Sequence, residues 1–413
     1  MRKMKDSEIS WVGEIPKEWS VWRNKYIFRI TKDIVLPSKN YQLLSLTTTG
    51  IKEKDENDNG GKVPENYDGY QIVKENDLVM CLFDLDCSAV FSGLSPYNGM
   101  ISPAYKVLKV KKRIANEQYY RYWFNYVGSK RFYKQYSKSL RFTLNADEFN
   151  RLFSLLPPLA EQRRIAEFLD RECGKIDGLK ADIQAQIDTL EQYKRSVITE
   201  AVTHGLNPSA PMKDSGIPWV GKTPEYWKVG RIGGLYELRN QKVSDKDFMP
   251  LSVTMKGILP QLETAAKTND GDNRKLVRVG DFAINSRSDR RGSCGISDYD
   301  GSVSLINTIL KPRNRMNAKY YNWLFHTPMF ADEFYKWGHG IVDDLWTTNW
   351  SEMKRISIPL PPLDEQQEIA NYLDNKCAEI EQIIADKKSQ IETLDGFKKS
   401  LIYEYVTGKK EVG

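Results

Sequence analysis

The sequence predicts an α+β protein in which two globular α+β domains form a tandem repeat with pseudo-two-fold symmetry, separated by an antiparallel coiled coil of two long helices. Two observations support this prediction. The segment LPPLAEQRRIAEFLD at residues 156–170 returns as LPPLDEQQEIANYLD at residues 360–374, with ten of the fifteen positions identical. Each copy is followed by a long stretch in which apolar residues recur at spacings of three and four, the pattern of a helical seam.

The repeat extends over most of the chain. MKDSEISWVGEIPKEW at residues 4–19 returns as MKDSGIPWVGKTPEYW at residues 212–227. Between these anchors the aligned segments are YQLLSLTTTGI with FMPLSVTMKGI, IVKENDLVM with LVRVGDFAI, and NEQYYRYWF with NAKYYNWLF. Two units of one design are therefore expected, with a first domain at 1–155, a first helix at 156–206, a second domain at 207–359 and a second helix at 360–413.

Each domain is predicted to combine short strands with aromatic helices. Runs such as GYQIVKENDLVMCLF and AYKVLKV are β-prone and are bounded by Gly, Asn or Asp, a composition typical of short strands. Aromatic stretches at residues 119–132 and 320–334 follow these runs and predict helices. We therefore expect a compact α+β domain in each half.

The long helices are predicted from their apolar stripes. In the first copy the stripe contains Cys173, Ile176, Ile183, Ile187, Leu190, Val197 and Ala201. In the second copy it contains Leu373, Cys377, Ile380, Ile384, Ile391, Leu394, Leu401 and Tyr405. The double prolines at 157–158 and 361–362 prevent extension toward the N-terminus. Each helix should span about 45 residues, or roughly 67 Å.

The symmetry of the repeat predicts how the two helices pair. A single solvated helix would leave its apolar stripe in water, so mutual burial is the favoured alternative. A two-fold axis perpendicular to the helices makes the pair antiparallel. One domain is then expected at each end, with the helices setting the distance between two similar modules.

Composition excludes several protein classes. The chain has 413 residues, 28% charged and 40% hydrophobic, which fits a globular protein. It has no run of eighteen apolar residues and no apolar segment behind the basic start, so neither a membrane span nor a secretory signal is predicted, and a cytoplasmic location is expected. Five cysteines without a CxxC pair and three histidines indicate neither a disulfide framework nor a metal site.

Enzyme motifs are weak or missing. GIPWVGKT at residues 216–223 matches a phosphate-binding loop, but prolines flank and interrupt it, and its repeat partner EISWVGEI lacks the lysine. The sequence contains no HExxH, GxSxG or dinucleotide-binding GxGxxG motif. We therefore expect a protein that is not an enzyme by itself.

Local charge indicates a polyanion as partner. Residues 111–151 contain ten basic and three acidic side chains, a net charge of +7, with six interleaved tyrosines. Such a surface attracts phosphates, and rings and guanidinium groups can contact bases or sugars. The alternative is that the aromatic residues are core and the lysines form a solvated face.

A second basic feature lies in the other half. NSRSDRRGSCGIS at residues 285–297 places three arginines among small polar residues, whereas the aligned CLFDLDCSAVFSG has none. Arginine forms bidentate contacts to guanine in the major groove, so the two domains should read different sequences if these loops meet bases; contact with phosphate alone stays open. The candidate DNA-binding residues are Lys138, Arg141, Arg287, Arg290 and Arg291.

Taken together, these segments identify a resemblance over essentially the whole chain. With WVGEIPKEW and WVGKTPEYW opening the halves, the two LPPL boundaries, and helices ending in KRSVITEAVTHGL and KKSLIYEYVTG, the chain resembles the DNA-specificity subunit of type I restriction-modification systems. The resemblance implies two target-recognition domains that read a bipartite, interrupted sequence in double-stranded DNA. It also implies a non-catalytic chain with no cofactor of its own and no membrane partner.

The same resemblance implies partner subunits. Two modification subunits would use S-adenosylmethionine to methylate adenine N6, and restriction subunits with motor and nuclease activity would use ATP and Mg²⁺. A structural adaptor that holds only proteins, or an enzyme with an unfamiliar site, remain as alternatives. Salt-dependent binding to a defined DNA site, binding to proteins alone, or turnover by the lone chain would distinguish the three.

Overall fold

The structure, a computed structural model, describes residues 2–35, 41–54, 67–261, 271–313, 316–340 and 346–413. The chain divides into unit 1, residues Met1–Ile183 with Ser389–Gly413, and unit 2, residues Gln184–Lys388. The two long helices, α4 (Leu159–His204) and α9 (Leu363–Val406), each contribute one half to either unit. Each unit therefore combines one globular domain with halves of both helices.

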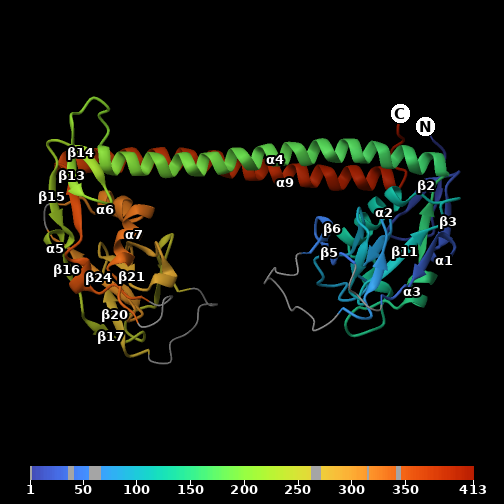
Figure 1. Ribbon diagram of the computed structural model, residues 1–413, viewed down its shortest axis with the longest axis horizontal. Coiled ribbons are helices and arrows are strands. Elements are labelled where there is room, and N and C mark those ends of the chain that lie inside the picture. The colour runs from blue at the N-terminus through green and yellow to red at the C-terminus, as the bar shows by residue number, and fades with distance from the viewer. Residues whose placement is uncertain (1, 36–40, 55–66, 262–270, 314–315, 341–345) are drawn as a thin grey trace. The chain divides into compact units, whose positions relative to one another are not determined.

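The centre of unit 1 is a four-stranded antiparallel sheet in the order β4-β11-β8-β9, accompanied by the two-stranded sheets β1-β2, β3-β12, β5-β6 and β7-β10 (Figure 1). The strands are β1 (Met4–Asp6), β2 (Glu14–Pro16), β3 (Ser20–Arg23), β4 (Phe28–Thr31), β5 (Leu44–Thr47), β6 (Gly50–Glu53), β7 (Gln71–Val73), β8 (Leu78–Met80), β9 (Ser92–Leu94), β10 (Gly99–Ile101), β11 (Lys106–Val110) and β12 (Phe153–Leu156). The helices are α1 (Asn24–Ile27), α2 (Glu117–Ser129), η1 (Phe132–Tyr136) and α3 (Ala146–Arg151).

Unit 2 repeats this arrangement. Its four-stranded sheet has the order β16-β24-β21-β22, next to a three-stranded sheet β17-β20-β23 and the pairs β13-β14, β15-β25 and β18-β19. The strands are β13 (Met212–Ile217), β14 (Gly221–Pro224), β15 (Lys228–Arg231), β16 (Tyr236–Leu238), β17 (Lys242–Val243), β18 (Leu251–Thr254), β19 (Gly257–Pro260), β20 (Arg274–Val277), β21 (Phe282–Asn285), β22 (Cys294–Ile296), β23 (Gly301–Val303), β24 (Asn307–Pro312) and β25 (Ser357–Leu360). The helices are α5 (Ile232–Leu235), η2 (Ser288–Arg290), α6 (Ala318–Phe325), α7 (Pro328–Lys336) and α8 (Trp350–Met353).

Two segments of unit 2 for which the sequence made a specific prediction can be compared with the structure. The helical stretch expected at 320–334 is two helices, α6 and α7, because Pro328 cannot continue the hydrogen-bond ladder and instead starts α7 behind a Thr327 cap. The rejected phosphate-loop match falls on β13, a turn and β14, an antiparallel hairpin that is followed by strand β15 and not by the helix that a phosphate-binding loop requires.

The long helices pair antiparallel within each unit. In unit 1, Asp177 of α4 accepts from Lys398 of α9 at 2.7 Å, and Lys180 donates to Asp395 at 2.5 Å, so partner numbers fall as α4 numbers rise. In unit 2, Lys194 pairs with Glu381, and Gln186 accepts from Lys387 at 2.6 Å. The predicted antiparallel direction is confirmed in both halves.

The repeated boundary motif ties each domain to its helices. Gln162 accepts from the backbone N–H of Asn116 at 2.8 Å and donates to the Pro157 carbonyl at 2.8 Å. Gln366 makes the same two contacts with Asn317 and Pro361, also at 2.8 Å. The double proline, the glutamine and the first aromatic helix thus form one hydrogen-bonded junction in each unit.

Buried tyrosines anchor the helix ends. The Tyr119 hydroxyl on α2 donates to the Val406 carbonyl at the end of α9 over 2.9 Å, and Tyr320 on α6 donates to the Val202 carbonyl of α4 over 2.8 Å. These bonds satisfy carbonyls that a helix end leaves without intrahelical partners. In Figure 1, α2 accordingly lies between the sheet of unit 1 and the long helices.

The cores confirm the predicted fold class of α+β domains with two long helices. In unit 1 the aromatic core is continuous with Ile165, Leu169 and Cys173 of α4 and with Leu401 and Val406 of α9. The core of unit 2 likewise includes residues of both helices: Val197, Ala201, Val202, Ile369, Ala370 and Leu373. All predicted stripe residues are buried or half-buried. No helix in the described part of the chain could cross a membrane.

Candidate nucleic-acid interface

Two loops of unit 1 meet at one place on its surface. The post-β8 loop is residues 81–91, and the pre-α3 loop is residues 137–145. They are joined by three backbone hydrogen bonds: Asp84 N to the Arg141 carbonyl (3.1 Å), Leu85 N to the Phe142 carbonyl (3.3 Å) and Leu144 N to the Leu82 carbonyl (2.7 Å). This pairing gives the two loops a shared, ordered surface.

Unit 2 contains the same loop pair. The post-β21 loop, residues 286–293, follows the strand equivalent to β8, and residues 346–349 precede α8. Ser288 N donates to the Trp346 carbonyl at 2.9 Å, and Thr348 N donates to the Ser286 carbonyl at 3.0 Å. Asn145 and Asn349 are the N-cap residues of α3 and α8, which places the two loop pairs at equivalent positions of the repeat.

The structure therefore brings the predicted site residues to one equivalent place in the two units. Lys138 and Arg141 lie on the pre-α3 loop, the second member of its pair, whereas the three predicted arginines of unit 2 lie on the post-β21 loop, the first member. In the sequence these groups stand at unrelated positions of the repeat. Only the hydrogen bonds between the loops show that both belong to the same kind of surface.

Five cations cluster around the pair in unit 1. The unit 1 basic surface consists of Lys130, Arg131, Lys134, Lys138 and Arg141, all exposed. Within the described ranges none of the five lies within ion-pair distance of a carboxylate. A shallow groove of about 470 Å³ runs along this surface and is lined by Lys130, Arg131, Phe132, Lys134, Gln135, Ser137 and Phe142. Unpaired cations along an open groove suit a phosphate backbone.

The backbone of this surface is held in unusual conformations. Asp84, Arg131 and Phe142 have positive φ angles of 49°, 53° and 45°. Such conformations cost about 1 kcal/mol or more in residues other than glycine, and they cluster at binding and active sites. Two further non-glycine residues with positive φ in the described chain, Glu8 and Asn76, lie elsewhere in unit 1.

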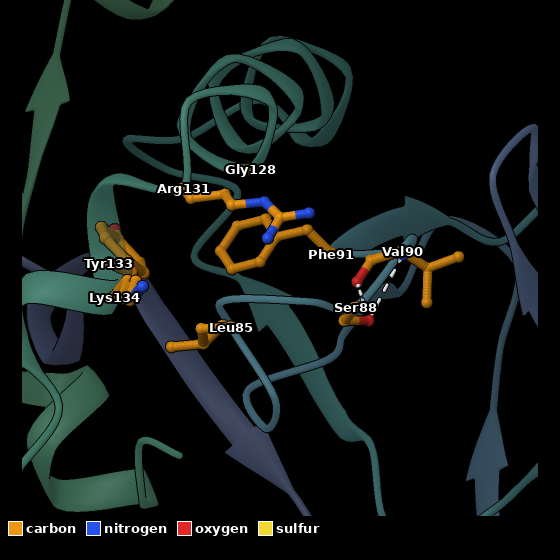
Figure 2. A pocket seen from close by; sticks show the side chains of 8 residues that line it. All are labelled: Leu85, Ser88, Val90, Phe91, Gly128, Arg131, Tyr133 and Lys134. Atoms are coloured by element: carbon orange, nitrogen blue, oxygen red, sulfur yellow. Dashed lines mark hydrogen bonds between the residues drawn. The ribbon is translucent and has the colours of Figure 1, made fainter. Parts of the chain in front are cut away.

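A small cleft beneath the surface is structural. Figure 2 shows its lining, in which Arg131 and Lys134 come from the segment after α2, and Leu85, Ser88, Val90 and Phe91 come from the post-β8 loop. Its volume of about 20 Å³ has room for a single water. A Cβ at Gly128 would lie 2.6 Å from Phe91, so this close approach requires glycine.

The tyrosines of the basic stretch are mostly core. Tyr119, Tyr120, Tyr122, Tyr126 and Tyr133 are buried, and burial raises the pKa of Tyr133 to about 12, so it is neutral at physiological pH. Tyr136 is 39% exposed. The alternative that these aromatic residues belong to the core therefore holds for the five buried rings, which are not available for contact with bases or sugars.

The arginines of unit 2 are in a different electrostatic state. Asp289 lies 3.3 Å from Arg287 and 3.8 Å from Arg290, and Arg291 pairs with Asp332 of α7. The Arg291 guanidinium also lies 5.7 Å from the centroid of the Tyr335 ring. The side chains of Arg290 and Arg291 are nevertheless 67% and 54% exposed. These cations are thus accessible but partly neutralised by neighbouring carboxylates.

Sequence reasoning did not single out three cations of the unit 1 basic surface. Lys130, Arg131 and Lys134 were part of the charge count at 111–151, but no motif distinguished them from Lys111 or Arg113. The counter-ion Asp332 was also missed, because it is 41 residues from Arg291 in the sequence. No group of His, Cys, Asp or Glu suited to a metal ion occurs among the residues that the structure describes.

Comparisons with known proteins agree with this architecture. Residues 224–393 match the family model described as type I restriction modification DNA specificity domain. Two proteins of Methanocaldococcus jannaschii are similar. One, named the MjaX specificity subunit of a type I restriction enzyme, is 23% identical over 97% of this chain and 96% of its own length. The other, the MjaVIII specificity subunit, is 24% identical over 83% of this chain and 80% of its own length.

Two solved structures share the fold. A chain from a structure on complex assembly and conformational transition of the type I R-M system aligns with a TM-score of 0.68 and 14% identity, covering 96% of this chain and 99% of the other. The HsdS subunit from Thermoanaerobacter tengcongensis aligns with a TM-score of 0.51 and 16% identity, covering 96% and 98%. These likenesses extend over nearly the full length of both partners.

Proposed function

This chain belongs to the family of type I restriction-modification DNA specificity subunits, and we propose that it reads an interrupted DNA target in two parts, one with the loop pair of each unit. As a specificity subunit it recognises DNA and assembles with the other subunits of the enzyme, and it is not itself catalytic. The proposal adds to family membership that each loop pair reads the bases of its own half of the target.

Two observations support the reading of the target in two parts. The loop pairs of unit 1 and unit 2 lie at equivalent positions of the repeat, and their charged residues are distributed differently. In unit 1 the post-β8 loop carries Asp84 and Asp86, and the cations Lys138 and Arg141 come from the pre-α3 loop. In unit 2 the post-β21 loop itself carries the arginines. The two equivalent surfaces carry their Lys and Arg hydrogen-bond donors on different loops. They would therefore present different arrangements of donors to the edges of base pairs.

We propose that the partners follow the family pattern. Double-stranded DNA is the ligand, two modification subunits methylate adenine with S-adenosylmethionine, and restriction subunits contribute ATP- and Mg²⁺-dependent translocation and cleavage. None of these cofactors is assigned to this chain. The exposed polar faces of α4 and α9 are the proposed docking surface for the modification subunits. We also place the complex in the cytoplasm, where its DNA ligand would be accessible.

The test combines methylation mapping with loop variants. Cells producing this chain with its modification subunits are sequenced for N6-methyladenine, and the consensus site is compared among the wild type, Lys138→Ala with Arg141→Ala, and Arg290→Ala. We expect the unit 1 pair to alter one part of the consensus and Arg290→Ala the other, with an unchanged spacer. Lys17→Ala, exposed on unit 1 outside the loop pair, is the matched control.

Four outcomes would contradict the proposal. An uninterrupted consensus would reject two-part reading, and loop variants that shift the same part of the site would reject one loop pair per half. If the loop variants methylate every site at a uniformly lower level, the replaced residues contact phosphate and not bases. Binding that depends only on protein partners, without any salt-dependent affinity for DNA, would favour a structural adaptor instead.

A further inference from the structure

The tip of the pre-α3 loop presents an apolar side chain to solvent. Leu140 is fully exposed, at 101% of its reference area. The nearest exposed residues along the chain are the cations Lys138 and Arg141 and the polar Ser139. A leucine with no packing partner contributes nothing to the domain core, so the stability of unit 1 does not account for its position.

The loop holds Leu140 in this position through its own hydrogen bonds. Phe142 N donates to the Ser139 carbonyl at 3.0 Å, which closes a turn with Leu140 and Arg141 at its centre. Thr143 N donates to the Ser139 hydroxyl at 2.7 Å, and the Ser137 hydroxyl donates to the Thr143 carbonyl at 2.9 Å. The bonds to the post-β8 loop fasten the same segment from the other side. The exposed leucine is therefore presented by an ordered turn.

The charge around Leu140 points to a nucleic-acid partner. Lys138 and Arg141 flank the tip, and neither pairs with a described carboxylate. Lys134 lies 4.4 Å from the centroid of the Phe142 ring, so a third cation borders the base of the turn. An acidic polymer would be drawn toward these cations, and the turn would enter the space between two rows of phosphates. The major groove is about 12 Å wide and admits an element of this size.

We propose that Leu140 is a base-contacting residue that reads the 5-methyl group of a thymine in the half-site recognised by unit 1. An aliphatic side chain cannot donate or accept a hydrogen bond. In the major groove it therefore distinguishes base pairs chiefly through the thymine methyl group. This inference rests on the proposed function, because it assumes that unit 1 reads one half of a DNA site.

The repeat predicts that this contact belongs to unit 1 alone. Alignment at the constant offset of 204 sets Asn145 against Asn349, and in that register the position of Leu140 corresponds to Asp344. Asp344 lies outside the described residues, so this comparison is one of sequence. A carboxylate cannot form an apolar contact with a methyl group and instead accepts hydrogen bonds. Thymine reading at this position should therefore be missing from the half-site of unit 2.

The experiment replaces single thymines with deoxyuridine, which removes only the methyl group. The probe is a duplex carrying the site defined by methylation mapping, and the protein is the full chain assembled with its modification subunits. We expect uracil at one thymine of the unit 1 half-site to weaken binding by the wild type roughly threefold to tenfold. The Leu140→Ala variant should bind the thymine duplex as weakly as the wild type binds the uracil duplex, with no further loss on uracil.

Two controls distinguish a methyl contact from a general loss of affinity or of folding. Leu206→Ala, an exposed leucine outside the loop pair, should bind both duplexes as the wild type does, and an unchanged melting temperature shows that Leu140→Ala leaves the fold intact. A unit 1 half-site without a T·A pair, or equal uracil effects in the wild type and Leu140→Ala, overturns the inference. A third readout uses 2-aminopurine as a fluorescent base in the duplex. If its fluorescence rises with the wild type but not with Leu140→Ala, and uracil has no effect, the inference is also overturned, because the side chain would then be separating stacked bases. Wild-type protein that binds no defined site overturns the proposed function, and this inference with it.

Discussion

The indole Nε1 of Trp19 donates a hydrogen bond of 2.9 Å to the Glu161 carboxylate, and Trp227 donates one of 2.8 Å to Glu365. Trp19 and Trp227 close the repeated opening segments, and both glutamates follow the double prolines at the start of the long helices. Both indole rings are almost completely buried. Each unit thus joins the start of its domain to the start of its helix through one buried donor and one carboxylate.

Removing this carboxylate should destabilise unit 1. Glu161→Ala leaves the Trp19 indole without its acceptor and removes the Arg2 partner at 2.6 Å. We expect the free energy of unfolding to fall by about 2–3 kcal/mol, because a buried donor loses its acceptor and the largely covered Arg2 retains only its more exposed partner Glu18. Urea unfolding followed by tryptophan fluorescence measures the change. Glu167→Ala, exposed on the same helix, is the control and should lie within about 0.5 kcal/mol of the wild type.

The tyrosine that caps the helix end should give a pH signature. Tyr119→Phe removes the bond to the Val406 carbonyl, and we expect a loss of about 1 kcal/mol at pH 7. Burial raises the pKa of Tyr119 well above its ordinary value. The unfolded chain therefore ionises first, and stability that is complete below about pH 10 falls as pH rises further.

The phenylalanine variant cannot ionise at this position, so its alkaline decline in stability should be shallower than that of the wild type. Urea unfolding at a series of pH values between neutral and strongly alkaline checks this. Tyr136→Phe, which changes a partly exposed ring, is the control for the substitution itself. Identical slopes for Tyr119→Phe and the wild type would show that Tyr119 ionises freely in the folded protein.

Releasing Arg291 from its counter-ion should strengthen DNA binding. Asp332→Asn removes the carboxylate that pairs with Arg291, and the freed guanidinium can then neutralise a phosphate. We expect tighter binding and a salt dependence steeper by about one phosphate contact, a change of roughly 0.9 in the slope of log K against log salt. A salt titration of the complex measures both. Asp247→Asn changes the net charge equally at another exposed position of unit 2. If that control has an equal effect on DNA binding, the effect of Asp332→Asn comes from net charge and not from the release of Arg291.

Arg290 should contribute sequence discrimination to one half-site. Its side chain is 67% exposed, and its contact with Asp289 is long, at 3.8 Å, so little must be broken before it binds a base. We expect Arg290→Ala to relax one base pair of the half-site at a cost of about 1–3 kcal/mol. Competition binding with duplexes that vary each position measures the profile. A loss that is equal for all sequences would assign Arg290 to the phosphate backbone.

The sequence by itself determined the frame of this protein. A repeated LPPLxEQ boundary, a repeated Trp-containing opening and two apolar stripes at helical spacing are local patterns, and each limits its own segment through proline geometry or through burial of one helix face. The antiparallel direction also followed from symmetry alone. Lys398 with Asp177 and Lys194 with Glu381 are equivalent positions at an offset of 204, so one repeated ion pair stabilises both halves.

Tertiary structure decided which residues share a surface and in what electrostatic state. The contact between Leu85 and Phe142 spans 57 residues and the pair Arg291–Asp332 spans 41, and no periodic pattern encodes such distances. Burial likewise separated the tyrosines of one basic stretch into core rings and an exposed one, because most tyrosines of helix α2 pack against the long helices. Local sequence specifies backbone preference and amphipathic faces, whereas a binding surface is made by long-range packing, which brings loops together only once the core has formed.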